Sequence, residues 1–425
     1  MIQARQLIAI MQRYSIPLIV GVFAGLAVAN LDDAFYQRLV EYEVFGGGAN
    51  LFGHHLTTRF FINQVFMVFF FGIAAKEITE SVLPGGALNP ASKAINPLLG
   101  TLGGVLGPAG LYLLLTFVFY GGGDDFSVVA NGWAIPTATD IALAWLVARL
   151  VFGNGHPAVN FLLLLAVADD AIGLGIIAVF YPDPEHPVNP QWLLLTAMGI
   201  AAVFGMRRLR VSYWPWYIII GGGLSWAGLL KSSIEPALAL VVIVPFLPGA
   251  HVGPAPALDE GNNGQPLHRP PGGAAISAHH HSPLEQFEHQ LKLFVDLGLF
   301  FFAFANAGVA FGSINSVTFI VLLSLIVGKM VGVSIFSLIA LRLGFPLPTG
   351  MDGRHLVVAG MIAGLGLTVA LFVASKAFAG PPMSPEAMFL DPAKMGALLS
   401  GGVFLLALAT GAILRVKDGA GRERD

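Results

Sequence analysis

Two adjacent carboxylates stand in the middle of a strongly apolar stretch of the sequence. Asp169 and Asp170 lie within FLLLLAVADDAIGLGIIAVFY, residues 161–181, which has about the length of the roughly 20 residues that span a bilayer as a helix. One acidic side chain at the centre of such a helix costs about 2.5–3.5 kcal/mol. Two of them must face protein or water, and carboxylates in that setting favour the binding of a positively charged group or ion.

A third carboxylate, Asp140, lies in the run NGWAIPTATDIALAWLVARL. Pro136 interrupts an ordinary helix because it removes a backbone donor and clashes with the preceding turn. The hydroxyls of Thr137 and Thr139 compete for the freed backbone groups. The run therefore predicts a discontinuous helix with Asp140 at the break. The alternative is an ordinary helix start, with Asp140 as its capping residue.

A second interruption is predicted in VVAGMIAGLGLTVALFVASKAF, residues 357–378. Gly360, Gly364 and Gly366 cluster there, and Thr368 follows them. Close packing of helices by small residues explains the glycines equally well. Taken together, however, the two interrupted runs are the pattern of transporters built from inverted repeats. The repeats would comprise the third to fifth and the tenth to twelfth spans.

Lys329 is the one basic residue near the centre of the apolar run 316–343. It lies too deep for its ammonium group to reach the membrane surface, so it needs a carboxylate or carbonyl partner, or it must be neutral. Asp169 or Asp170 is the natural partner. A purely structural ion pair is the alternative to a role in chemistry.

The composition indicates that membrane-spanning helices hold the three aspartates and Lys329. The mean hydropathy is +0.75, 56% of the residues are hydrophobic and only 11% are charged, whereas soluble proteins carry about 25% charged residues. We therefore expect an all-α polytopic membrane protein. The net charge of −3 gives no sign of nucleic-acid binding, and the absence of cysteine excludes disulfides and thiolate chemistry.

About twelve apolar runs are long enough to be considered as spans. The first is taken as a retained span, because no cleavage pattern follows it. The eighth is interrupted by Pro236, Pro245 and Pro248 and is short. Most Lys and Arg residues fall on one side if both termini are cytoplasmic, as the positive-inside rule favours. The runs are residues 14–30, 59–83, 95–120, 131–152, 157–181, 191–207, 212–230, 234–248, 288–312, 316–343, 354–379 and 394–416.

Two of the stretches between the runs stand out. Residues 41–55, with a glycine cluster, predict a small external hairpin or loop. Residues 249–283 are rich in Pro, Gly, Asn and His and predict a flexible cytoplasmic loop. The histidines 279–281 within it are metal-binding residue types, but consecutive histidines in such a loop lack a fixed ligand geometry.

Several long segments resemble the NhaA-type sodium/proton antiporter family across nearly the whole chain. They are AIPTATDIA (134–142), LLAVADDAIGLGIIAVFY (164–181), FFAFANAGV (301–309), VGKMVGVSIF (327–336) and GLGLTVALFVASKAF (364–378). The resemblance implies a single transporter unit of inverted repeats in which two broken helices cross. A core bundle would comprise residues 95–181 and 316–416. An interface bundle would comprise residues 14–83 and 191–312.

The resemblance also implies site roles. Asp170 would be the principal sodium ligand, with Asp169, Asp140 and a hydroxyl or carbonyl of Thr139 as further ion-binding groups, and Asp169 would pair with Lys329. Asp140 and Lys329 would compensate the partial charges of the helix ends at the crossing. The implied protein is a homodimer among lipids of the bacterial cytoplasmic membrane and works in sodium and pH homeostasis without a cofactor.

Three positions depart from the family pattern. Ala74, Gln64 and Glu235 stand where well-known members carry Glu, Asp and His, and those positions have been tied to pH regulation and the cation pathway. Candidate pH-responsive residues are therefore Glu235 together with four charges on the cytoplasmic side, for which surface solvation is the alternative: Lys76, Glu77, Glu285 and His289.

The expected activity is exchange of Na⁺ or Li⁺ for H⁺ by alternating access, with more H⁺ than Na⁺ moved per cycle. Sodium would bind Asp170 and Asp169 and break the pair between Asp169 and Lys329, so that the lysine releases a proton. A sodium-coupled symporter of related fold is the alternative. An intramembrane aspartyl protease is a remote one, because its Tyr-Asp and Gly-x-Gly-Asp signatures are absent around the three aspartates.

Overall fold

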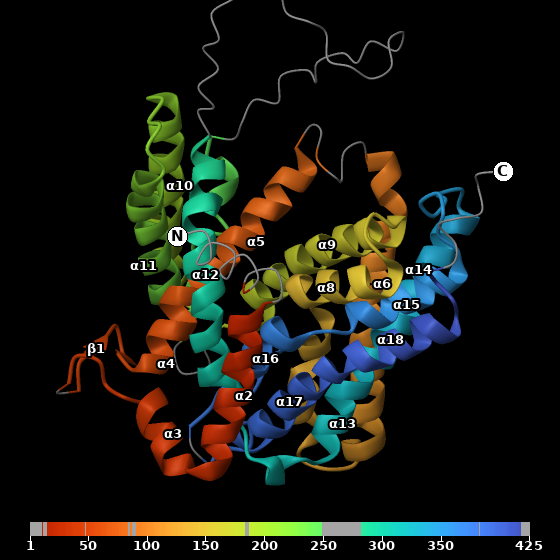
Figure 1. The fold of residues 1–425 in the computed structure, drawn as a ribbon. Helices are drawn as coiled ribbons and strands as arrows, with labels where there is room; N and C mark the ends of the chain where they lie inside the picture. Colours follow the sequence, from red (N-terminus) through yellow and green to blue (C-terminus); the bar gives the residue numbers. More distant parts are fainter. Residues whose placement is uncertain are drawn as a thin grey trace, which may run out of the picture.

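A computed structural model describes residues 11, 15–46, 48–83, 86, 91–182, 187–248, 282–381 and 383–417 of the chain. Helices dominate this part of the protein, and one short hairpin lies at its edge (Figure 1). The histidines 279–281 and most of the loop predicted at residues 249–283 lie outside the described residues.

The first half of the chain forms the following elements: α2 (Ile16–Leu31), α3 (Asp33–Val40), β1 (Asn50–Leu51), β2 (His54–His55), α4 (Thr58–Phe60), the π-helix η1 (Phe61–Phe66), α5 (Met67–Val82), α6 (Ala91–Tyr120), α7 (Phe126–Ala130), the 3₁₀-helix η2 (Asn131–Thr137), α8 (Ile141–Phe152) and α9 (Pro157–Phe180).

The second half forms α10 (Leu193–Arg208), the π-helix η4 (Tyr217–Gly222), α11 (Gly223–Lys231), the 3₁₀-helices η5 (Pro236–Leu238) and η6 (Val244–Phe246), α12 (Pro283–Ala307), α13 (Ser316–Leu323), the π-helix η8 (Ser324–Gly328), α14 (Lys329–Arg342), α15 (Gly353–Ala363), α16 (Leu367–Ala377), α17 (Ala387–Leu399), the 3₁₀-helix η9 (Ser400–Gly402) and α18 (Val403–Ile413). Short 3₁₀ turns η3 (Pro190–Trp192) and η7 (Phe311–Ser313) precede α10 and α13.

Six helical segments in the described residues are long and apolar enough to cross a membrane, and two bent pairs of helices pass the same test together. The prediction of a helical membrane protein is therefore confirmed. The count of twelve spans and the inverted repeats stay predictions. The six segments are Thr58–Val82, Ala94–Tyr120, Pro157–Phe180, Pro283–Ala307, Ser316–Arg342 and Ala387–Ile413.

The two bent pairs fall where the sequence predicts interruptions. Residues 126–137 and 141–152 meet at 53°, and residues 353–363 and 367–377 meet at 49°. In the first pair, Pro136 and Thr137 belong to the last 3₁₀ turn, and the break itself is the extended segment 138–140. In the second pair, residues 364–366 form the break.

Glycine is required at residue 364 of the second break because the backbone of η8 approaches it closely. A Cβ atom on Gly364 would lie 2.5 Å from the carbonyl oxygen of Leu325, and one on Gly366 would lie 2.7 Å from the Leu325 side chain. Thr368 does not belong to the break but to the first turn of α16.

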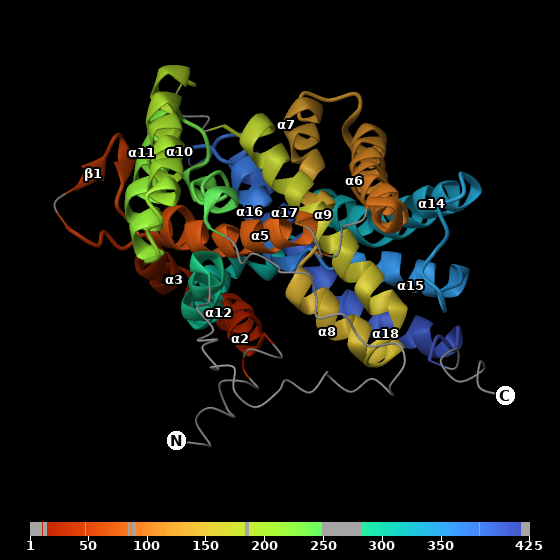
Figure 2. The ribbon, with the colours of Figure 1, turned by 90° about the horizontal axis from the view of Figure 1, so that it is seen from above.

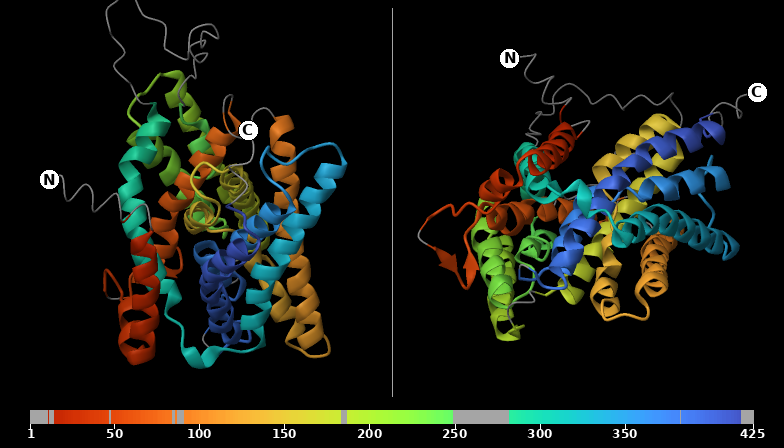
Figure 3. Two further views of the ribbon diagram at one scale, coloured as in Figure 1. Left: turned by 45° about the vertical axis from the view of Figure 1, so that its right-hand side comes forward. Right: turned by 90° about the horizontal axis from the view of Figure 1, so that it is seen from below.

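The helices form two groups, with α5 and α16 between them (Figure 1, and Figure 3 from two other sides). One group contains α2 packed on α12 and α10 packed on α11. The other contains α6 packed on α14, with α8, α9, α15 and α18 alongside (Figure 2). The division of the chain into a core and an interface bundle follows the same lines and stays a prediction.

The prediction of a hairpin at residues 41–55 is confirmed, whereas the prediction of a helical span at residues 234–248 is wrong. Strands β1 and β2 pair antiparallel, with Asn50 opposite His55, so the predicted hairpin is present, and its external location stays a prediction. The eighth predicted span, residues 234–248, is no α-helix. It forms turns and the 3₁₀-helices η5 and η6, each of which has a proline in its first turn. The three prolines lack the backbone donors that an α-helix needs, so tighter i→i+3 bonds replace it.

Candidate functional site

The structure pairs Lys329 with Asp169 in the interior of the protein. The ammonium group lies in hydrogen-bond contact with Oδ2 of Asp169, and both side chains are fully buried. Lys329 also donates to the hydroxyl oxygen of Thr139 at 2.6 Å. The buried ammonium therefore has one charged and one neutral acceptor, which a lysine in a low-dielectric interior requires.

Thr139 links this pair to both breaks. It lies in the extended segment before α8, and its hydroxyl is 2.7 Å from Oδ2 of Asp169 and 2.8 Å from the carbonyl oxygen of Ala363. Since Ala363 ends α15, that carbonyl is one of the unpaired acceptors that a helix C-terminus leaves. The threonine hydroxyl thus joins the ion pair to the negative end of the second broken helix.

Asp140 occupies the opposite side of the same crossing. Its backbone N–H donates to the carbonyl oxygen of Leu365 at 2.6 Å, so the two breaks bond to each other directly. Its carboxylate caps α8 by accepting from the Leu143 N–H at 3.1 Å. It also accepts from the Thr368 hydroxyl at 2.8 Å and lies 3.4 Å from the Thr368 N–H. The Asp140 carboxylate therefore accepts hydrogen bonds from the first turns of both α8 and α16.

Asp170 differs from its neighbour because it faces a cavity. The cavity has a volume of about 920 Å³, and its lining includes Asp170, Asp140, Thr139 and Thr368 but not Asp169. Oδ1 of Asp170, like Oδ1 of Asp169, is buried and has no hydrogen-bond partner among the described residues. An oxygen with two open lone pairs beside a solvent-sized cavity is suited to bind a cation that enters through it.

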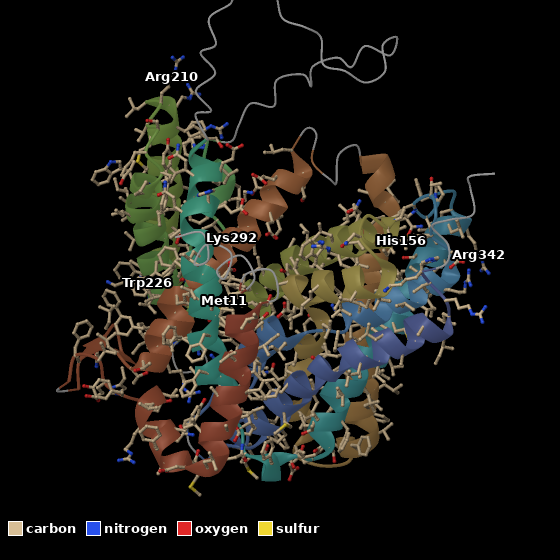
Figure 4. The ribbon with its side chains drawn as sticks, viewed as in Figure 1. Met11, His156, Arg210, Trp226, Lys292 and Arg342 are labelled. Atoms are coloured by element: carbon tan, nitrogen blue, oxygen red, sulfur yellow. The ribbon has the colours of Figure 1, made fainter. Side chains whose placement is uncertain are left out.

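The cavity extends towards the end of the molecule where α5 ends. Its lining continues from Asp170 to Glu80 and Gly86, and to Met11 and Lys292, which are labelled in Figure 4. This is the end that the distribution of Lys and Arg predicts to be cytoplasmic, and it is called the inner end below. The carboxylates of Glu77 and Glu80 and the ammonium group of Lys292 line the cavity between this end and Asp170.

The candidate pH-responsive residues are scattered over this end and the opposite one. Glu77 lines the cavity, and Glu285 completes the capping box of α12 with Ser282. The interpretation of Lys76 as a solvated surface charge is wrong. Its side chain is 8% exposed and pairs with Glu80 of the same helix at 2.6 Å and with Glu288 of α12. These two carboxylates compensate the charge of the buried ammonium group.

Glu235 lies at the other end of the molecule and has a partner that sequence reasoning missed. Its carboxylate pairs with Lys376 at 2.5 Å, and the side chain of Gln64 bonds to both groups once its amide is oriented to satisfy them. The only sign of this ion pair in the sequence was the position of Lys376 near the end of an apolar run. Ser400 was also missed: its hydroxyl accepts from the Gly366 N–H at 3.4 Å and so supports the second break.

The fold and this site define a polytopic helical membrane protein in which a buried carboxylate–lysine pair sits where two broken helices cross. A family model described as Na⁺/H⁺ antiporter 1 matches residues 5–414. The chain belongs to this family. The prediction of a transporter that is not an enzyme and needs no cofactor is thereby confirmed.

Relatives from several bacteria match nearly the full length of the chain. The chain is 52% identical over 414 residues to a Na⁺/H⁺ antiporter NhaA of Geobacter metallireducens, which covers 97% of this chain and 99% of the relative. It is 50% identical over 419 residues to the protein of that name from Geobacter sulfurreducens, with the same coverage. A Na⁺/H⁺ antiporter NhaA of Jannaschia sp. is 40% identical over 435 residues, covering 95% and 97%.

Proposed function

We propose that this protein exchanges Na⁺ or Li⁺ for H⁺ across the bacterial cytoplasmic membrane by alternating access, and that Asp170 is the ion ligand. One observation carries the assignment to Asp170. Of the two adjacent carboxylates, only Asp170 lines the cavity, whereas Asp169 does not line it and is held by Lys329 through Oδ2. The names of the relatives support Na⁺ and H⁺ as the exchanged ions.

The exchange follows from competition for the same oxygens. A hard cation such as Na⁺ binds oxygen ligands, and carboxylate oxygens add compensating charge. Protons bind those oxygens too, so the site holds either the metal ion or protons when it changes sides. Binding of Na⁺ at Asp170 draws Asp169 into the ligand set and away from Lys329. The lysine, left without its counter-charge in a buried site, releases its proton into the cavity.

The carboxylates give up one proton when Na⁺ binds and Lys329 gives up a second, so more H⁺ than Na⁺ moves per cycle and the exchange is electrogenic. Each net charge that crosses the membrane couples to about 2.3 kcal/mol per 100 mV. The membrane potential then drives sodium export, in keeping with a role in sodium and pH homeostasis. In this proposal residues 95–181 and 316–416 move as a core that contains the inverted repeats. Residues 14–83 and 191–312 stay as the interface, and the hairpin of β1 and β2 joins two copies in a homodimer.

The assignment is tested with Asp170→Asn in proteoliposomes that carry an imposed proton gradient. We expect sodium-driven proton movement to be lost, because a neutral amide cannot compensate Na⁺. Asp125→Asn is the matched control, since Asp125 is exposed in the loop before α7. Normal exchange by Asp170→Asn would remove the assignment. A sodium-dependent pH change without any organic substrate separates exchange from the symporter alternative.

A further inference from the structure

Three polar side chains meet at the end of the molecule opposite the cavity mouth. Lys376 lies in the last turn of α16, Glu235 precedes η5 and Gln64 belongs to η1. Lys376 Nζ is 2.5 Å from Glu235 Oε2. In the orientation that satisfies both neighbours, the Gln64 amide donates to Glu235 Oε1 at 2.6 Å and accepts from Lys376 at 2.9 Å. We call these three residues the outer cluster.

The outer cluster is separated from the ion site along two helices. Thr368, in the first turn of α16, contacts Asp140, whereas Lys376 lies eight residues further along, about 12 Å away. On the helical segment Thr58–Val82, Glu77 lines the cavity and Gln64 precedes Glu77 by more than three turns. The cluster therefore lies beyond the ion site as seen from the inner end.

Aromatic side chains fill the space between the ion site and the outer cluster. The rings of Phe71 on α5 and Phe372 on α16 meet edge to face with centroids 5.1 Å apart, and both are buried. Phe302 on α12 lies against Phe372 as well. Lys376 Nζ itself is 5.5 Å from the centre of the Phe372 ring. An apolar layer of aromatic rings thus closes the path from the ion site to the outer end, and the outer cluster lies on the outer side of this layer.

The outer cluster connects parts that alternating access must separate. Lys376 belongs to the broken helix that carries the second break, whereas Glu235 and Gln64 belong to the segments proposed as the interface. The Glu235 side chain is only 3% exposed. Moving Lys376 away would leave that carboxylate buried without a counter-charge, unless water or a cation reaches it. A small cavity of about 120 Å³ at the cluster, lined by Tyr181, Ser233 and Ser375, gives room for a few water molecules.

We propose that Lys376 is the gating residue of the outer end: its contacts with Glu235 and Gln64 hold that end closed while Asp170 is open to the inner end. The proposal rests on the exchange by alternating access proposed above. When the core moves, Lys376 leaves Glu235, the aromatic layer opens and water enters along the carboxylate. When the gate closes again, the ammonium group returns to the exit and repels a released sodium ion.

The gate is tested by the accessibility of a single cysteine, since the natural chain has none. Ser375→Cys places a thiol beside Lys376, in the lining of the small cavity. The probe is a membrane-impermeant maleimide applied to the outer face of oriented vesicles. In the Ser375→Cys background we compare Lys376→Met, which removes the charge, with Lys376→Arg, which retains it, and with Glu235→Gln, which removes the partner.

We expect Lys376→Met and Glu235→Gln to raise the labelling rate at least tenfold and Lys376→Arg to leave it within about twofold of the parent. Lys231→Met is the control for loss of a lysine near this end, since Lys231 lies over the rings of Phe52 and Trp192. The gate variants should also raise the KM for Na⁺ at the inner face more than they lower the maximal rate, because fewer molecules are open inwards. A purely structural role of Lys376 would not produce that split.

The outcomes separate the two proposals. Equal labelling of all variants, in protein whose parent exchanges Na⁺ for H⁺, overturns the gate and leaves the proposed function standing. If the parent moves no protons in response to Na⁺, the proposed function fails and the gate that rests on it fails too. If Lys376→Met does not fold, Glu235→Gln and Lys376→Arg decide the question by the same readouts.

Discussion

Gly328 directly precedes Lys329, and we expect Gly328→Ala to displace that lysine from the ion pair. A Cβ atom on Gly328 would lie 2.5 Å from Cα and 3.0 Å from N of Pro108 in α6. The obstructing atoms are backbone, so no side-chain rotation relieves the clash. Bringing the contact to between 3.0 Å and 3.4 Å, the lower limit of ordinary packing, requires η8 and α6 to separate by about 0.5 to 0.9 Å.

The consequence for the site follows from the same distances. Lys329 Nζ is 2.6 Å from the Thr139 hydroxyl, and a shift of that size would lengthen the bond to roughly 3.1 to 3.5 Å, the limit of a hydrogen bond. A lost hydrogen bond to a charged group costs about 1.5–3 kcal/mol, and overpacking costs a further ~1–3 kcal/mol of stability. We therefore expect the sodium-driven proton flux at limiting Na⁺ to fall at least about tenfold.

The assay combines proton flux in proteoliposomes with thermal unfolding in detergent. Gly110→Ala is the matched control, because Gly110 lies on the same helix as Pro108 and a Cβ atom there meets nothing within 4 Å. That variant should be as stable as the parent or slightly more so. If Gly328→Ala and Gly110→Ala have the same flux and the same unfolding temperature, the reasoning from close packing to lysine position is refuted.

Two further predictions concern residues at helix N-termini. Thr368→Val removes the hydroxyl donor to Asp140 at 2.8 Å without a change of shape; we expect a loss of about 1.5–3 kcal/mol of stability, seen as a lower unfolding temperature. Burial and the stacked ring of His355, 4.7 Å away, lower the pKa of His156 at the start of α9. The folded state thus favours the neutral ring, so its stabilisation is present above about pH 6.5 and is lost as the pH falls. His156→Asn keeps a capping acceptor, and its unfolding temperature between pH 7 and pH 5 should fall less than that of the parent.

The charges inside apolar runs could be predicted from the sequence because the membrane makes each of them conspicuous. Asp140, Asp169, Asp170 and Lys329 are costly unless partnered, and the structure gathers them at one crossing. Residue order alone left open which aspartate holds Lys329. On α9 the two side chains point about 100° apart, so only the packing of α14 decides that Asp169 meets the lysine.

Other features depend on packing that leaves no mark on the local sequence. The residues of the outer cluster, Gln64, Glu235 and Lys376, are far apart along the chain, and the charges near the ends of apolar runs are normally solvated. The π-helix η8 before Lys329 also escapes prediction, because π- and α-helices have the same apolar residue types. The tight approach of Pro108 to Gly328 becomes visible only when α6 lies against η8.

The contacts at the crossing also separate the roles of the three aspartates. Asp140 faces two helix N-termini, whose unpaired N–H groups carry partial positive charge, and its oxygens accept from Leu143 and Thr368. A carboxylate engaged by fixed donors on both oxygens must give up those bonds to bind an ion. Asp170 lines the cavity and has an oxygen, Oδ1, without a partner among the described residues, and Asp169, whose Oδ1 also has none, is held by Lys329 through Oδ2. We infer that Asp140 balances the helix ends and keeps the crossing rigid, while the cation is exchanged at Asp170.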